Sequence, residues 1–134
     1  MAVAALAMAV AGTVYAQTGE TPMSLEGART VSAAEAKGLI EHGTAVFDVR
    51  KKASFVEGHM PKAKSIKKSD ETEAFDPAAL GGNKDAPLLI YGHGSDGWSA
   101  VDAVKTAISA EYKKVHWMRG GWVEWTKAGM PIEQ

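Results

Sequence analysis

The sequence contains no cysteine in its 134 residues, and this absence excludes several kinds of chemistry. The chain can form no disulfide, and its side chains can supply no thiolate as a nucleophile, a metal ligand or a carrier of sulfur. It also lacks an excess of charge of either sign, with a formal net charge of −1 at pH 7. This balance argues against nucleic acid as a partner, because binding to phosphates needs a surplus of Lys and Arg.

Long apolar runs are also scarce, and the one at residues 1–16 is shorter than the roughly 20 apolar residues of a comfortable membrane span. It ends in Val14-Tyr15-Ala16, a pattern that signal peptidases cut. We therefore expect residues 1–16 to be a signal peptide, with an uncleaved membrane anchor as the alternative. The cleaved protein is then expected to be periplasmic or secreted, without membrane contact. Residues 17–28 are small and polar and are expected to form a flexible leader.

Residues 29–134 alternate apolar strand patterns with helical patterns, which is typical of an α/β fold in one domain. Ser32, with Glu35 three positions later, predicts a capping box on a helix that ends near His42. Asp76 followed by Pro77 predicts the start of a shorter turn. Strands are expected at 29–31, 45–49, 64–67, 87–91 and 114–118, and further helices at 98–111 and after Gly120-Gly121. The alternation predicts a sandwich around a mostly parallel sheet.

Ligands of open α/β sheets bind beyond the carboxyl ends of the strands, and three of the predicted ends carry polar or glycine-rich segments. These are Asp48-Val49-Arg50, the loop Gly92-His93-Gly94-Ser95-Asp96-Gly97, and Arg119-Gly120-Gly121. The loop leads into a helix at Trp98. Such a loop gathers backbone N–H groups at a helix N-terminus, which suits an anion.

Three segments, taken in order, resemble the rhodanese-like domain family. The first contains Asp48-Val49-Arg50, Phe55 and Glu57-Gly58-His59-Met60-Pro61; the second is Tyr91 with the 92–97 loop; the third contains Trp117-Met118-Arg119-Gly120-Gly121, Trp125 and Gly129-Met130-Pro131. The resemblance covers about residues 29–134 and implies a three-layer α/β sandwich, with helices flanking the sheet, of the sulfurtransferase type.

The resemblance also shows what this sequence lacks. In active members a cysteine follows the strand-ending tyrosine and carries a persulfide, and that position is Gly92 here. Some exported members have a second cysteine at the position of Gly97, and many others have an arginine nearby that holds an anionic substrate. Both are missing. Glycine supplies no nucleophile, so no residue of this chain is expected to be catalytic.

The polar residues of the loop have other interpretations. His93, Ser95 and Asp96 are too close in sequence to reach the geometry of a hydrolytic triad readily. We expect Ser95 and Asp96 to stabilise the turn and cap the following helix. No metal site is expected, because the four histidines are scattered, although weak cation binding by His93 and Asp96 stays open.

Asp48 and Arg50 are expected to form a charge pair that ties the strand end to a neighbouring loop, or else to orient a ligand. Arg119 is the expected contact for an anion, with stacking on Trp117 or Trp122 as the alternative. The other tryptophans are expected to pack in the core or at its rim: Trp98, Trp122 and Trp125.

These observations predict a non-catalytic domain without a cofactor. Its 92–97 loop, with Trp98, is expected to bind a small oxyanion, a sulfur species or a segment of a protein partner, supported by Asp48, Arg50 and Arg119. One alternative is an enzyme that relies on a partner's cysteine entering the loop. Another is a structural or interaction domain whose loop is vestigial.

Overall fold

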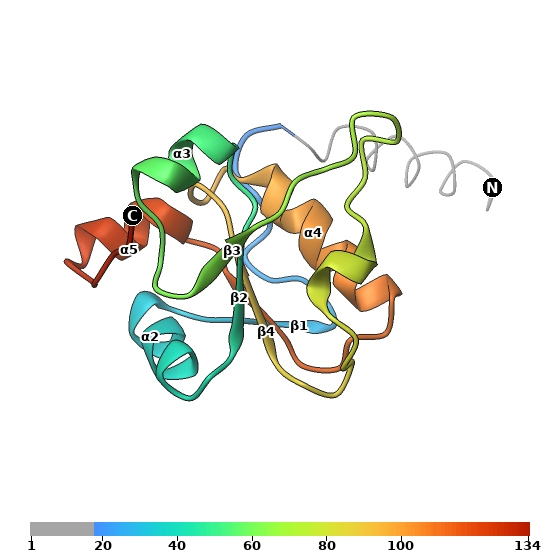
Figure 1. Ribbon diagram of the computed structural model, residues 1–134, viewed down its shortest axis with the longest axis horizontal. Helices are drawn as coiled ribbons and strands as arrows, with labels where there is room; N and C mark the ends of the chain where they lie inside the picture. Colours follow the sequence, from blue (N-terminus) through green and yellow to red (C-terminus); the bar gives the residue numbers. More distant parts are fainter. Residues whose placement is uncertain (1–17) are drawn as a thin grey trace, which may run out of the picture.

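The computed structural model of the protein describes residues 18–134 (Figure 1). The predicted signal peptide, residues 1–16, and Gln17 lie outside the described residues. Among residues 18–134, no helix combines the length and the apolar character needed to cross a bilayer. The last residues return to the domain, where Glu133 pairs with His59 in an isolated antiparallel bridge.

Five strands form one parallel sheet in the order β1-β5-β4-β2-β3. Their bounds are β1 Ala28–Thr30, β2 Ala45–Asp48, β3 Ala63–Ser65, β4 Leu88–Tyr91 and β5 Val115–Met118. β4 is central, with β2 and β5 on either side, and the short β3 lies at an edge. Because all five strands run parallel, their carboxyl ends meet at one end of the sheet.

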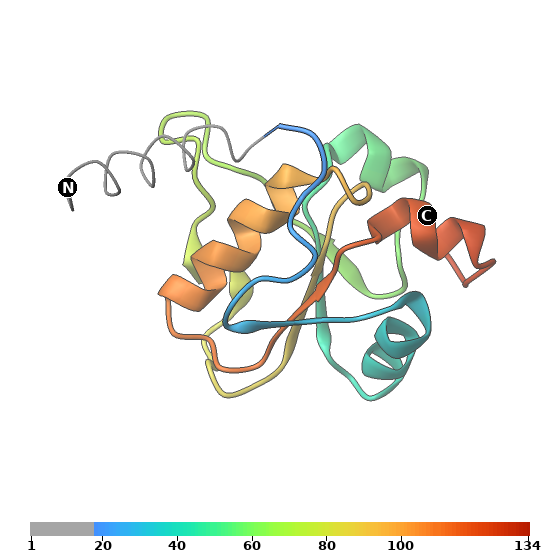
Figure 2. The ribbon, with the colours of Figure 1, turned by 180° about the vertical axis from the view of Figure 1, so that it is seen from behind.

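Helices cover both faces of this sheet (Figures 1 and 2). α4 (Trp98–Ser109) and the 3-10 turn η1 (Pro77–Leu80) lie on one face, and α2 (Ala33–Glu41) and α5 (Gly121–Lys127) lie on the other. Successive residues of the central strands point to opposite cores: Phe47 and Ile90 join the α4 core, whereas Val46 and Leu89 join the α2–α5 core. The predicted α/β sandwich with a parallel sheet is confirmed.

The predicted helix starts are present. The Ser32 hydroxyl accepts a hydrogen bond from the Glu35 N–H at 3.2 Å, and Glu35 Oε1 accepts one from the Ser32 N–H at 2.9 Å. Asp76 Oδ1 accepts from the Ala78 N–H at 2.9 Å, at the start of η1. These caps satisfy donors that a helix leaves unpaired in its first turn.

The sequence patterns did not predict α3 (Lys52–Glu57), which follows β2. Its N-cap, Lys51, makes no side-chain cap, and none of its six residues is buried. A helix with neither a capping residue nor a buried stripe leaves no apolar period in the sequence.

A buried network joins the ends of β2 and β4 to the segment after α3. The Arg50 guanidinium forks onto Asp48, with Nη2 at 2.8 Å from Oδ2 and Nε at 3.1 Å from both carboxylate oxygens. The same Nη2 donates to Gly58 O at 2.7 Å. Tyr91 Oη donates to Asp48 Oδ2 at 2.5 Å and accepts from the Met60 N–H at 3.1 Å. The expected charge pair is present and ties the strand end to the loop before β3.

Residues 18–27 differ from the expected flexible leader because they pack on the domain. Thr21 and Leu25 are buried. The N–H and the hydroxyl of Thr21 donate to Ser95 O at 2.9 and 2.7 Å, and Trp98 Nε1 donates to Gly19 O at 2.9 Å. The segment is held mainly through backbone groups, so its polar composition did not reveal the contact.

Replacing Tyr91 with phenylalanine should destabilise the domain by about 1–3 kcal/mol, because Asp48 loses a donor and the buried Met60 N–H loses its acceptor. Tyr112→Phe is the matched control. Within residues 18–134 the Tyr112 hydroxyl bonds only the carbonyls of Pro77 and Gly81, so a loss of about 0.5–1.5 kcal/mol is expected. Urea denaturation measures both, as changes in midpoint at constant m-value. Equal losses of stability in the two variants would contradict the role of the Tyr91 hydroxyl in the buried network.

Stability should fall above about pH 10, and Tyr91 should account for part of the fall. Burial, and then the Asp48 carboxylate, raise the pKa of Tyr91 far above its usual range. Below about pH 10 both states hold the proton, but at higher pH the unfolded chain releases it and the folded state does not. Denaturation at about pH 9 and pH 11 should therefore show a smaller loss for Tyr91→Phe than for the parent, while Tyr112→Phe retains the parent's Tyr91 contribution.

Candidate functional site

A pocket of about 390 Å³, here called the loop pocket, lies beyond the carboxyl ends of β2 and β4. Its walls come from the residues after β2, the start of α3, the 92–97 loop and the first turn of α4. They are Val49, Arg50, Lys51, Ser54, Gly92, His93, Asp96, Gly97, Trp98, Ser99 and Ala100. Two of the three strand ends that the sequence singled out line this pocket, and the third, Arg119-Gly120-Gly121, meets the 92–97 loop from its other side.

The start of α5 fixes one side of the 92–97 loop. The Trp122 N–H donates to Gly92 O and the Val123 N–H donates to His93 O, both at 2.9 Å. Gly121 sits at the point of closest approach, with φ +55°, and a Cβ there would lie 2.5 Å from Gly92 O. Only glycine fits such a position, so the Gly120-Gly121 pair serves to dock α5 on the loop.

The amide hydrogens of the loop are left available. Its carbonyls from Gly92 to Ser95 accept hydrogen bonds from α5, Gly97 and Thr21. In contrast, the N–H groups of His93, Gly94, Ser95 and Asp96 donate to no atom of the described residues. Four successive unpartnered amides in a tight loop carry partial positive charge and can bind an anion.

At Gly92 the loop carries no side chain, and the space a Cβ would enter is narrow. That Cβ would lie 3.2 Å from Ala100 Cβ and 3.5 Å from Val49 Cγ2. The floor of the loop pocket is therefore apolar at this point. The φ angle of Gly92 lies outside the left-handed region, so the backbone would accept a side chain at this position. The size of that side chain is limited by the neighbouring atoms.

The expected helix cap by Ser95 and Asp96 is not observed. Gly97 occupies the N-cap of α4 without a side-chain bond. The Ser95 hydroxyl donates to Glu20 Oε2 at 3.1 Å, and the Asp96 carboxylate makes no hydrogen bond or ion pair with the described residues. Since the loop is already held by α5 and by Thr21, its turn does not depend on these side chains.

Arg119 is not placed as an anion contact. Its Nε and Nη2 donate to Pro22 O and Thr21 O, both at 2.8 Å, and Nη2 lies 3.6 Å from a Glu20 carboxylate oxygen. The alternative predicted for Arg119 was stacking on a tryptophan. In the structure Arg50 makes such a contact, with its Cζ 4.4 Å from the Trp122 ring centroid. The contact of Arg119 with residues 21 and 22 was not predicted, because their carbonyls have no recognisable pattern in the sequence.

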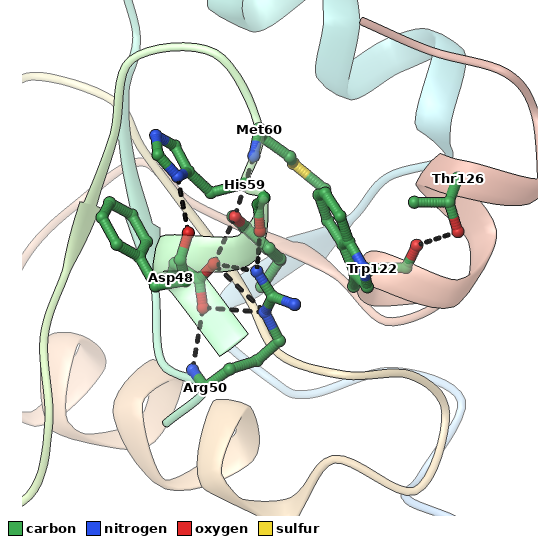
Figure 3. Close-up of polar contacts among 9 residues, drawn as sticks. Asp48, Arg50, His59, Met60, Trp122 and Thr126 are labelled. Carbon is green, nitrogen blue, oxygen red and sulfur yellow. Dashed lines mark hydrogen bonds and ion pairs between the residues drawn. The ribbon is translucent and has the colours of Figure 1, made fainter. Parts of the chain in front are cut away.

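The tryptophans take up core and rim positions as expected. Trp125 is fully buried, and its Nε1 donates to Pro131 O at 2.7 Å. Trp98 and Trp122 are half-buried at the edges of the site. His59, labelled in Figure 3, stacks on Phe55 with ring centroids 3.8 Å apart.

Two further pockets adjoin the loop pocket. One, of about 340 Å³, shares Arg50, Ser54 and His93 with it and extends to Glu57, Gly58 and Trp122. The other, of about 680 Å³, shares His93 and Asp96 and extends to the leader and α5. Within residues 18–134, no group of three or more His, Asp or Glu side chains is arranged to hold a metal ion.

Sequence reasoning missed the contribution of α3 to the site. Lys51 and Ser54 line the loop pocket, and so do Val49, Ser99 and Ala100. In the sequence, the indication that Val49 and Lys51 lie at the site was their position within and directly after the Asp48-Val49-Arg50 strand end. Ser54 carried none, because the helix that positions it was not predicted.

Comparison with known proteins agrees with this architecture. The sequence model of the family described as Rhodanese-like domain matches residues 32–128. The solved structure of the Alr3790 protein from Anabaena sp. has a TM-score of 0.63 and 26% identity, covering 77% of this chain and 90% of that chain. A solution structure of the Rhodanese-like domain of that protein gives 0.62 and 27%, over 78% of this chain and 77% of that chain.

A rhodanese-related protein from Thermoplasma volcanium shares the fold, with a TM-score of 0.62 and 23% identity, over 78% of this chain and 97% of that chain. The family match spans the sheet from α2 onward, including both strand ends that form the loop pocket. The three motifs in their order, the parallel five-stranded sheet and the family match lead to one conclusion. This cysteine-free chain belongs to the rhodanese-like domain family.

Proposed function

We propose that this is a non-catalytic rhodanese-like domain that binds a small oxyanion, another sulfur species or a partner segment in the loop pocket. The observation that supports it is the loop itself. Gly92 at the floor has no side chain, and the next four N–H groups donate to no atom of the described residues; of these four residues, His93 and Asp96 line the loop pocket. The predicted signal peptide remains a prediction, and so does a periplasmic or secreted location.

Sulfur transfer through a persulfide needs a thiolate that the chain does not have. In that reaction a thiolate attacks the outer sulfur of thiosulfate, the S–S bond of thiosulfate breaks, and sulfite leaves with the electron pair. The loop pocket has two hydroxyls, from Ser54 and Ser99, and one imidazole, from His93. Within residues 18–134 neither hydroxyl is hydrogen-bonded to His93 or Asp96, so no nucleophile is paired with a base there. Ser95 bonds Glu20, so a triad with these residues is not assembled.

Binding needs less than catalysis, and the features it needs are retained. The loop is held by α5 and by Thr21 through contacts that do not involve a side chain at position 92. Amides held in advance bind an anion without the cost of ordering the loop on binding. Lys51 at the wall adds a positive charge.

The two alternatives lead to different results. If a partner's cysteine enters the pocket, sulfur transfer should appear only when that partner is added. If the loop is vestigial, the domain should bind neither anions nor sulfur donors. The following experiments separate these cases from simple binding.

The variant Gly92→Cys should gain sulfur transfer from thiosulfate to cyanide, measured as thiocyanate, whereas the parent chain should show none. The added Cβ faces Ala100 and Val49 at the floor of the loop pocket, so the thiol enters the existing site. If crowding by Ala100 prevents activity, the double variant Gly92→Cys/Ala100→Gly should restore it.

The matched control is Gly94→Cys, which places the same thiol in the same loop but toward the Val123 side chain, 3.4 Å from its Cγ2. Gly94 and Val123 line the 680 Å³ pocket and not the loop pocket. This variant should stay inactive. Turnover by the parent chain would refute the non-catalytic assignment, and activity of Gly94→Cys alone would show that the loop pocket is not the site.

Thermal unfolding should show anion binding by the parent chain. Thiosulfate, sulfite, sulfate and phosphate are compared at an ionic strength matched with chloride. A ligand at ten times its Kd stabilises the folded state by about 1.4 kcal/mol, which raises Tm by on the order of 5 °C for a domain of this size.

Ser54→Leu is the control, because it narrows the loop pocket from α3 without touching the core. Sulfate and phosphate also stabilise proteins by exclusion from the surface, and that effect should be equal in both chains. A shift in the parent that is absent from Ser54→Leu supports binding. Equal shifts, or none, would favour the vestigial loop.

A further inference from the structure

The segment before β1 is tied to the 92–97 loop and to the start of α4. The N–H and the hydroxyl of Thr21 both donate to Ser95 O, at 2.9 and 2.7 Å. Trp98 Nε1 donates to Gly19 O at 2.9 Å. Figure 2 shows this segment in blue beside α4. Every acceptor in these contacts is a backbone carbonyl.

Arg119, which follows β5, adds a third point of attachment. Its Nε donates to Pro22 O and its Nη2 donates to Thr21 O, both at 2.8 Å. The same Nη2 lies 3.6 Å from a Glu20 carboxylate oxygen. Consecutive residues of one short segment are therefore attached to a loop, a helix and the end of a strand.

This attachment buries little of the segment. Of residues 19–24, only Thr21 is buried, and the side chain of Met23 is 75% exposed. The Thr30 hydroxyl donates to Met23 O at 3.4 Å, which is a long hydrogen bond. A segment held by hydrogen bonds near the surface, with few buried apolar groups, opens at a lower free energy than the core.

The next residues, 25–28, are fixed on the core. Leu25 is 9% exposed and packs in the α4 core, and the Ala28 N–H donates to Leu25 O at 3.0 Å. Gly27 has a φ of +92° and lies so close to α4 that a Cβ there would be 3.1 Å from Ile108 Cγ2. Residues 25–28 thus form a pivot directly after the exposed segment.

We propose that residues 19–24 form a strap that opens and closes as one unit on this pivot while the sheet stays folded. Opening breaks the bonds to the loop, α4 and the end of β5 together, because they hold adjacent residues of the strap. It also removes Gly19 and Glu20 from the wall of the 680 Å³ pocket. The strap therefore sets the width of this pocket, whether or not the loop pocket binds an anion.

Hydrogen exchange of the ¹⁵N-labelled chain, followed by NMR, tests the strap. The Thr21 N–H, Trp98 Nε1–H and Arg119 Nε–H should have the same protection factor, because each is bonded in a contact that opening breaks. Trp125 Nε1–H and Arg50 Nε–H are matched references, since the same chemical groups are bonded elsewhere in the domain. Their protection factors should be at least about tenfold higher.

The variant Thr21→Val removes the hydroxyl bond to the loop at nearly constant side-chain volume. If the strap opens as a unit, it should lower the protection of Trp98 Nε1–H by about twofold to tenfold, although that indole is bonded to Gly19. Thr106→Val is the matched control, because the Thr106 hydroxyl donates within α4. The control should leave the protection of Trp98 Nε1–H unchanged.

Two results would overturn the strap. Equal protection of the strap groups and the references would show that the segment opens only when the whole domain unfolds. Unequal protection among the three strap groups, or a Thr21→Val effect confined to residue 21, would show that the contacts break independently.

Discussion

The buried contact between Asp48, Arg50 and Tyr91 is the constraint on which the rest of the site depends. A carboxylate with no accessible surface is costly unless its charge is paired and its oxygens accept hydrogen bonds. Here the guanidinium, the Tyr91 hydroxyl and the Arg50 amide satisfy it. Because the partners come from β2 and β4, and pass the connection on to Gly58 and Met60, one charge pair fixes the strand ends and the loop after α3 relative to each other.

The 92–97 loop is held in a complementary way, by its carbonyls. The first N–H groups of α5, which a helix leaves without internal partners, bond the loop from one side, and Thr21 bonds it from another. These contacts use the loop carbonyls as acceptors, whereas the N–H groups of residues 93–96 donate to no atom of the described residues. A loop fixed in this manner presents positive partial charge whatever side chain stands at position 92. The absence of a nucleophile at position 92 therefore does not by itself change the conformation of the 92–97 loop.

Much of the fold could be predicted from the sequence, because apolar runs and caps act locally. Ser32 with Glu35, and the strands before Asp48 and Gly92, were placed correctly for that reason. The site was predicted less well. α3 has no buried stripe, so Ser54 went unnoticed. Arg119 and Arg50 could not be told apart, since the choice between a ligand and a carbonyl depends on segments distant in the chain. The packing of residues 18–27 on the domain was not predicted, because contacts through backbone groups leave no pattern in the side chains.

Arg119 and Arg50 each use a guanidinium group to hold separate segments of the chain together. Arg119 donates from Nε and Nη2 to two carbonyls, and Nη2 lies 3.6 Å from a Glu20 carboxylate oxygen, so this side chain holds residues 18–27 against the domain. Arg50 is more deeply buried, yet its pairing is incomplete, because one carboxylate and one carbonyl satisfy only three of its five donors. The geometry that stabilises the strand ends therefore leaves two donors over. The structural role of Arg50 thus uses Nε and Nη2, on the edge of the planar group that faces Asp48 and Gly58.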